Sequence, residues 1–215
     1  SSFLNLQRTS KINMANILGD ELLWTDGYQG PSQMIYNSPR NISISKAIGY
    51  TLGQPWPQGY TVVNLQTIEA IKYPPLHPPG QALVTVADFQ SLFTGKYLQG
   101  FYRWTYFNGS KPVTSPIAPL IISQNEDADG NFVYSVDNAI DITVQTGAET
   151  VTKIEICFKI NNAYYTVDVL DKYDSSGTVI IPSNSTHTYR YFGDRIINVL
   201  AELEVLKTHD TLPQV

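Results

Sequence analysis

The sequence predicts a mainly β protein built around an immunoglobulin-like or fibronectin type III-like β-sandwich. Three observations carry this prediction. Short stretches of alternating apolar and polar residues recur through residues 81–192, with turn-forming residues between them. Helical periodicity is confined to the C-terminal end of the chain. The chain has 215 residues, and because one sandwich needs about 100 residues, we expect further elements around it.

Residues 1–72 predict an irregular β segment. The stretch ELLWTDG, residues 21–27, predicts a short strand that runs into an Asp-Gly turn. Residues 33–44 predict two more strands on either side of a proline bend, and the Gly- and Pro-rich residues 46–60 predict a packed loop. Because three short strands cannot close a domain alone, we expect this segment to complete a neighbouring sheet.

Residues 73–80, YPPLHPPG, predict a linker. Four prolines in eight residues favour extended polyproline geometry. A stiff boundary between two parts of the chain is the favoured interpretation. The alternative is a docking motif for an aromatic groove on a partner.

The sandwich itself is expected over residues 81–192. Alternation puts the apolar side chains of each strand on one face, so one face of each sheet should be buried and the other solvated or docked. Cys157, the sole cysteine, lies in an apolar strand and is interpreted as a small buried residue. The strands are expected at residues 82–88, 97–107, 117–123, 139–146, 151–160, 164–171, 178–182 and 188–193.

Residues 193–215 predict a C-terminal helix and tail. Apolar residues recur at helical spacing over residues 194–207, and Asp194 is a candidate N-cap. We expect this apolar stripe to pack on the rest of the chain or on a partner. The stripe consists of Ile196, Val199, Leu200, Leu203 and Leu206.

Composition and charge exclude several functional classes. Only 15% of the residues are charged and the net charge is -5, with no cluster of Lys and Arg. Nucleic-acid binding, which needs a basic surface, is therefore disfavoured. No apolar run reaches the roughly 18 residues of a membrane span, and the chain opens without a signal-peptide pattern. An uncharged polar surface is common in extracellular or assembled β proteins.

The sequence offers no catalytic, cofactor-binding or metal-binding constellation. Residues 125–131, NEDADGN, match the first positions of a calcium loop, but Val136 stands where the bidentate Glu belongs. A solvated hairpin turn is the favoured interpretation, and calcium is the alternative. The three histidines have no metal-ligand spacing, and no nucleophile elbow or phosphate-binding loop is present. We therefore expect a protein that is not an enzyme and needs no cofactor.

The stretch GFYRWTYFNGSKPVTSP, residues 100–116, supplies the candidate contact residues. In an extended strand, Tyr102, Trp104 and Tyr106 share one face, which we expect to lie in the core. The opposite face could meet water, a sugar or the next subunit. The candidate contact surface consists of Trp56, Phe101, Arg103 and Phe107.

Several stretches, taken in order, resemble the tail stabilisation or muzzle proteins of crAss-like phages of Bacteroidetes. They are ELLWTDGYQGPSQMIYNSPRNISISKAI, YPPLHPPGQALV, LFTGKYLQGFYRWTYFNGSKPVTSPIAPLI, ITVQTGAETVTKIEICFK and TYRYFGDRIINVLAELEVLKTHDTLPQ. The resemblance implies a non-enzymatic component of the virion tail whose partners are copies of itself and other tail proteins. It carries no catalytic residues.

Two functions from different classes follow. The first is a structural tail subunit that acts through assembly contacts. The second is an extracellular carbohydrate-binding or adhesin module that binds a host-surface glycan on an aromatic platform drawn from Trp56, Phe101, Phe107 and Tyr164.

Overall fold

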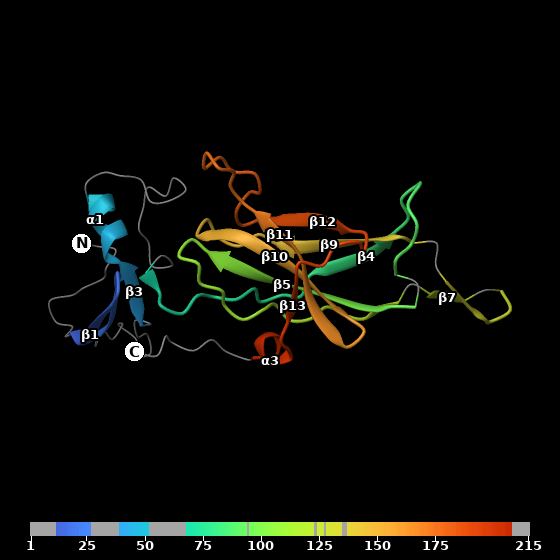
Figure 1. Ribbon diagram of the computed structural model, residues 1–215, viewed down its shortest axis with the longest axis horizontal. Helices are drawn as coiled ribbons and strands as arrows, with labels where there is room; N and C mark the ends of the chain where they lie inside the picture. Colours follow the sequence, from blue (N-terminus) through green and yellow to red (C-terminus); the bar gives the residue numbers. More distant parts are fainter. Residues whose placement is uncertain are drawn as a thin grey trace, which may run out of the picture. The chain divides into compact units, whose positions relative to one another are not determined.

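The computed structural model describes residues 12–26, 39–51, 68–93, 95–122, 124–126, 128–134 and 137–207. The chain forms two compact units, one made mainly of residues before Pro74 and the other mainly of the residues from Pro74 onward (Figure 1). The chain is mainly β, as the sequence predicts, and its described sheets are antiparallel.

The first unit contains a three-stranded sheet and a helix. The sheet has the order β1-β2-β3, with β1 (Ile12–Leu18), β2 (Glu21–Asp26) and β3 (Arg40–Ser43). β2 and β3 lie where the sequence predicts strands, whereas β1 was not predicted. Trp24 of β2 and Ile42 of β3 are buried.

The loop predicted for residues 46–60 is wrong over its first part, because α1 (Ile44–Thr51) is a helix. The side chain of Asp20 accepts hydrogen bonds from the backbone N–H of Ser45 at 3.0 Å and from the Ser45 hydroxyl at 2.6 Å. A carboxylate is a favourable partner for the unpaired N–H groups of a first helical turn. Since this partner is 25 residues away, no local sequence pattern predicts the start of the helix. The rest of the predicted loop, including Trp56, lies outside the described residues.

The second unit is a β-sandwich, which confirms the predicted fold class (Figure 1). Its two sheets have the orders β12-β9-β4 and β13-β11-β10-β5-β6. The smaller sheet consists of β4 (Gly80–Val84), β9 (Ala139–Gln145) and β12 (Thr186–Tyr191). The larger sheet consists of β5 (Tyr97–Tyr106), β6 (Ile121–Ile122), β10 (Val151–Ile160), β11 (Ala163–Asp171) and β13 (Asn198–Leu200).

The main core fills the space between these two sheets. Alternate residues of neighbouring strands meet there, as their period of two requires. The sheets approach closely at Gly100, where a Cβ atom would lie 2.8 Å from the Ile142 side chain. The buried members of this core are Phe93, Leu98, Tyr102, Ile140, Ile142, Val144, Ile154, Ile156, Phe158, Val167 and Tyr191.

Two predictions for the connecting segments have different outcomes. The hairpin turn expected at residues 125–131 is present, between β7 (Gln124–Glu126) and β8 (Phe132–Tyr134). The strand predicted at residues 178–182 is wrong, because Val179 forms only an isolated bridge with Tyr173. Val179 and Ile180 of that stretch are exposed, whereas Ile181 is buried.

The C-terminal helix is present but much shorter than predicted. α3 (Glu202–Val205) has four residues, and its N-cap is Ala201 rather than Asp194. The preceding residues form β13, because pairing with β11 places Leu200 opposite Tyr164 and buries it. Tertiary pairing has therefore overridden the helical period of the sequence.

Candidate functional site

Most residues on both faces of β5 are buried, whereas the sequence predicts burial of one face only. On the inner face, Tyr102 and Tyr106 are buried as predicted. Trp104 is partly buried against the main core, and its indole N–H donates a hydrogen bond to the Gln145 carbonyl at 2.9 Å. The aromatic side chains on the inner face of β5 therefore belong to the core.

Two residues of the predicted contact surface on the outer face of β5 are covered within the same chain. Phe101 and Arg103 are buried, so they form no open platform. Phe107 is half-buried, and Trp56 lies outside the described residues. The reason is that two segments of the same chain cover this face.

The first cover is the segment 110–118, which runs beside β5. The backbone N–H of Ser115 donates to the Tyr102 carbonyl at 2.8 Å, and that of Ala118 donates to the Gly100 carbonyl at 2.8 Å. The segment is not a regular strand, because Pro112 and Pro116 have no N–H to donate.

The second cover is the C-terminal segment 198–205, called the strap below, in which β13 is the edge strand of the five-stranded sheet and α3 follows it against the outer face. Two of its side chains, Leu200 and Val205, enter a small apolar cluster on the outer face. This outer cluster also contains Phe101, Cys157 and Tyr164, with Ile117 packed against it. The rings of Phe101 and Tyr164 meet edge to face, with centroids 6.1 Å apart.

Cys157 is a buried member of this cluster, as predicted. Burial raises the pKa of its thiol to about 12. Because the thiolate is the nucleophilic form, Cys157 is unreactive while the strap is in place.

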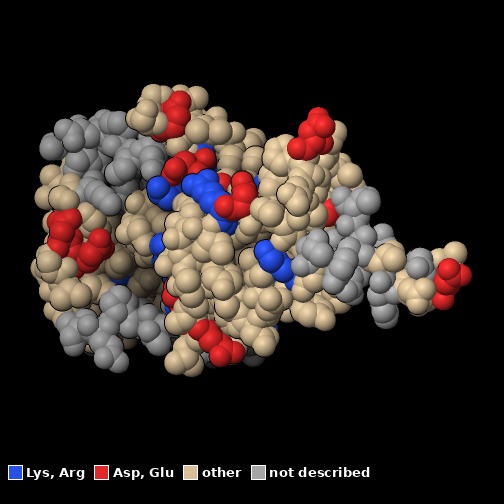
Figure 2. All heavy atoms as spheres, turned by 45° about the vertical axis from the view of Figure 1, so that its right-hand side comes forward, with Lys and Arg blue, Asp and Glu red and all other residues tan. Residues whose placement is uncertain are grey.

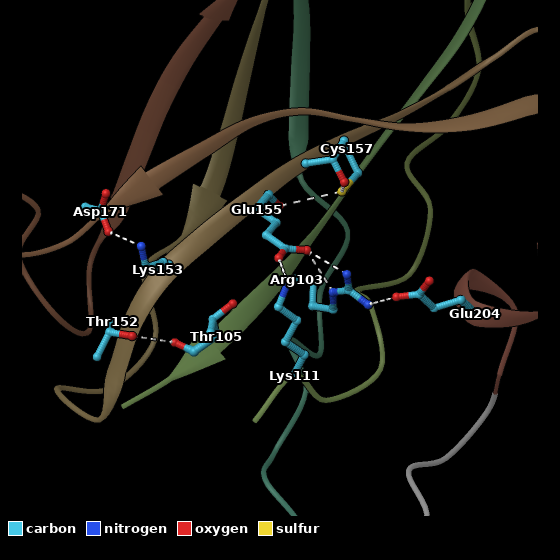
Figure 3. A network of polar contacts seen from close by, with 10 residues as sticks. Arg103, Thr105, Lys111, Thr152, Lys153, Glu155, Cys157, Asp171 and Glu204 are labelled. Atoms are coloured by element: carbon cyan, nitrogen blue, oxygen red, sulfur yellow. Dashed lines mark hydrogen bonds and ion pairs between the residues drawn. The ribbon is translucent and has the colours of Figure 1, made fainter. Parts of the chain in front are cut away.

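Next to the outer cluster lies a network of four charged side chains, called the charge cluster below (Figure 3). Arg103 lies between two carboxylates and donates to Glu155 Oε2 from Nε at 3.0 Å and from Nη2 at 2.7 Å. Its Nη1 donates to Glu204 Oε1 of the strap at 2.5 Å. Lys111 Nζ donates to the other oxygen of Glu155. Two positive and two negative charges therefore balance.

Arg103 and Glu155 favour their ionised forms although both are buried. The side chains of Arg103 and Glu155 are each 5% exposed. Burial by itself would raise the pKa of Glu155, but the hydrogen bonds and charges of Lys111 and Arg103 outweigh it and hold that pKa below its usual value. In the same way, Glu204 and Glu155 outweigh burial and raise the pKa of Arg103.

The strap is attached by few contacts. β13 forms three residue pairs with β11, and the Ile197 N–H donates to the Thr166 carbonyl at 2.8 Å. The Thr114 hydroxyl donates to the Val205 carbonyl at 3.2 Å. The side of the strap that faces away from the sheet is apolar and exposed, and Leu203 is 88% exposed.

A second buried cation, Lys172, closes one end of the sandwich and was not singled out in the sequence. Its Nζ donates to the carbonyls of Thr146 at 3.0 Å and Ala148 at 2.9 Å, and to the Ser183 hydroxyl at 2.9 Å. These partners follow β9 and precede β12, so Lys172, which follows β11, ties the two sheets together. Burial lowers the pKa of Lys172 to about 8.

The described residues contain no group of three or more His, Cys, Asp or Glu side chains that could hold a metal ion. Within the same residues, no helix has the length and apolar character needed to cross a membrane. The chain matches no protein-family model, no curated protein and no solved structure.

Proposed function

We propose that this chain is a non-enzymatic structural subunit of a multi-copy assembly. The resemblance of its sequence to tail stabilisation proteins makes a phage virion tail the assembly of choice. In this role the chain acts by burying surface against copies of itself and against other tail proteins.

The observation that carries the proposal is the exposure of β1. All seven residues of this edge strand are exposed, on both of its faces. Four of them are large and apolar, namely Ile12, Met14, Ile17 and Leu18. An apolar edge strand offers unpaired N–H and C=O groups together with apolar side chains, and proteins that stay single usually block such edges. A strand of this kind is suited to pairing with a neighbouring chain.

The character of the surface agrees with this role. Figure 2 shows that charged side chains cover only a small part of the visible face, in keeping with a charged content of 15%. Charged residues are depleted in the buried centres of interfaces. A surface with few charges can therefore be buried against a neighbour at little desolvation cost.

The experiment compares Ile17→Lys with Asn13→Lys in the full chain by analytical ultracentrifugation. Both positions are exposed on β1, so each variant adds one charge at the same strand. We expect the wild-type chain and Asn13→Lys to form oligomers and Ile17→Lys to shift towards a monomer, because only Ile17→Lys replaces an exposed apolar side chain that a neighbour would bury. A wild-type chain that stays monomeric at every concentration and in mixtures with other tail proteins would contradict the proposal.

The carbohydrate-binding alternative receives no support from the described residues. Three members of its platform, Phe101, Phe107 and Tyr164, are buried or half-buried. A sugar platform needs exposed ring faces, and Phe101, Phe107 and Tyr164, the expected members that the structure describes, form no such row.

A further inference from the structure

We infer that the outer face of β11, β10 and β5, together with the edge of β11 that pairs with β13, is a docking site for the strap, and that in an assembly the strap that fills it comes from a neighbouring copy. The inference rests on the proposed function, since only a multi-copy assembly brings a second strap within reach. It names the partner, a second copy of this chain, and the segment through which the partner binds.

The receiving face is built from strands that are held independently of the strap. Phe101, Cys157 and Tyr164 lie on β5, β10 and β11. The opposite faces of these same strands carry Tyr102, Ile156 and other residues of the main core. The docking site therefore keeps its shape when the strap leaves, because the second sheet still holds the strands from the other side.

The strap itself is held weakly. It contributes two buried apolar side chains, Leu200 and Val205, one ion pair and a short strand at the edge of its sheet. These contacts are few for a segment of eight residues, each of which loses conformational freedom when it is fixed. A segment held by few contacts opens locally without unfolding the domain.

The net positive charge of the docking site favours binding of a segment with an acidic side chain. Without the strap, Arg103, Lys111 and Glu155 leave one positive charge in excess on the receiving face. The strap supplies Glu204, which bonds to Arg103 and restores neutrality. An uncompensated buried cation is costly, so the site favours a segment with a carboxylate at this position.

Exchange between copies keeps every contact of the closed strap and adds new ones. Swapping an identical element is a low-cost route to oligomers, because the same contacts form in trans. In the single chain, Val199, Leu203 and Leu206 of the C-terminal end remain exposed. When the strap bridges two copies, these side chains lie at the junction and can be buried between them. That additional burial is available only to the exchanged arrangement.

The connection to the strap is suited to such an exchange. Residues 194–197 carry no regular secondary structure and are exposed. Ile196 and Ile197 in this connector are exposed apolar residues, so they too lose exposure if the connector runs between two copies. The connector spans at most about 14 Å when extended, which requires the two docking sites to lie close together.

The first experiment makes a covalent bond that can form only between copies. The strap donor is Val205→Cys/Cys157→Ala, and the acceptor is the wild-type chain, whose sole cysteine is Cys157. The two positions belong to the same outer cluster. Mild oxidation of a mixture should give a covalent heterodimer joined at positions 157 and 205, in an amount that rises with concentration.

The matched control donor is Leu203→Cys/Cys157→Ala, because Leu203 lies on the same strap but points away from the sheet and is 88% exposed. We expect it to give at least several-fold less bond to Cys157. If single-chain Val205→Cys forms the bond internally while the mixture gives none, the strap stays in its own chain and the inference is overturned.

A second measurement decides the outcome when no bond forms in any variant. A fluorescent peptide of residues 195–207 is titrated with the intact wild-type chain and followed by anisotropy. Saturable binding is expected, weakened about three- to tenfold by Glu204→Gln in the peptide and changed less than about twofold by Glu202→Gln, whose side chain is exposed and makes no described ion pair. A peptide that does not bind at any concentration overturns the inference.

The size of the wild-type chain separates this inference from the proposed function. A chain that forms oligomers but takes up neither the peptide nor the strap donor assembles through another surface, such as β1. In that case strap exchange is wrong and assembly stands. A chain that is monomeric at all concentrations and takes up neither probe counts against both.

Discussion

The two faces of the five-stranded sheet are closed in different ways. The inner face packs against a complete second sheet and buries an apolar core of eleven residues. The outer face is covered by the irregular segment 110–118 and by the strap, with five residues in its buried cluster. The same strands are thus covered on one face by a complete sheet and on the other by two short segments.

This difference shows that a residue can be fully buried and still lie beneath a segment that opens easily. Phe101 and Phe158 are both fully buried, but Phe158 is enclosed by strands of both sheets and Phe101 partly by a short terminal segment. Local opening depends on the contacts that a segment makes, not on how deeply it hides the residues beneath it. We therefore expect the inner face to control global stability and the outer face to open on its own.

The largest expected effect is the loss of stability when a side chain on the inner face is truncated. Phe158→Ala removes a ring that stacks on Tyr191 with a centroid distance of 4.9 Å, and it leaves a cavity in the main core. We expect the free energy of unfolding to fall by about 3–5 kcal/mol, measured by urea denaturation. The control Leu203→Ala, on the exposed side of the strap, should change it by less than about 0.5 kcal/mol. Equal effects of the two variants would remove the distinction between the covers.

The next largest effect concerns the charge cluster on the outer face. Glu155→Ala leaves Arg103 buried with only Glu204 beside it, and we expect a loss of about 3 kcal/mol. The control Asp141→Ala breaks a more exposed ion pair with Arg190 and should cost no more than about 1 kcal/mol. Comparable losses in the two variants would show that the buried charges are not coupled to folding.

The pH dependence of stability follows from the same carboxylate. Because the pKa of Glu155 is lower in the folded chain than its ordinary value, about 4.3 in an unfolded chain, the unfolded state binds more protons in acid. Its contribution is present above that value and is lost as the pH falls through the folded pKa. Glu155→Gln should flatten this part of the acid limb in a series of urea titrations, and an unchanged limb would assign it to other groups.

Much of the fold follows from local patterns, and the failures have a common cause. The alternation in residues 151–160 predicts β10 with the same bounds that the structure has, because the pattern and the pairing agree. The helix predicted over residues 194–207 is shortened to α3 because β13 pairs with β11, a partner that no local pattern reveals. α1 was missed for the same reason, since its cap is the distant Asp20.

The candidate site shows the same limit. The sequence places Arg103 and Glu155 on strands and assigns Arg103 to the outer face, and the structure agrees. It could not show that Lys111 and Glu204, which are 44 and 49 residues from Glu155, meet them there. The charges of Lys111 and Glu204 can be used to predict this cluster only after the pairing of the strands is known.

A smaller effect is expected at the end of the sandwich, where neither cover is involved. Lys172→Met leaves the carbonyls around its ammonium group without their donor, and we expect a loss of about 1–3 kcal/mol. The control Lys153→Met removes an exposed ion pair with Asp171, which is worth at most about 1 kcal/mol. Urea denaturation of both variants tests this, and a neutral Lys172→Met would mean that the loops around it hold without the lysine.

The reactivity of Cys157 tests the central claim most directly, because this sole cysteine lies beneath the strap. Its reaction rate with a thiol reagent is measured in the wild-type chain at increasing urea, well below the unfolding transition. If the strap opens alone, labelling is governed by a free energy of opening below that of global unfolding, with little dependence on urea because little surface is exposed. Labelling that follows global unfolding, with the same free energy and the same urea dependence, would contradict a separable cover.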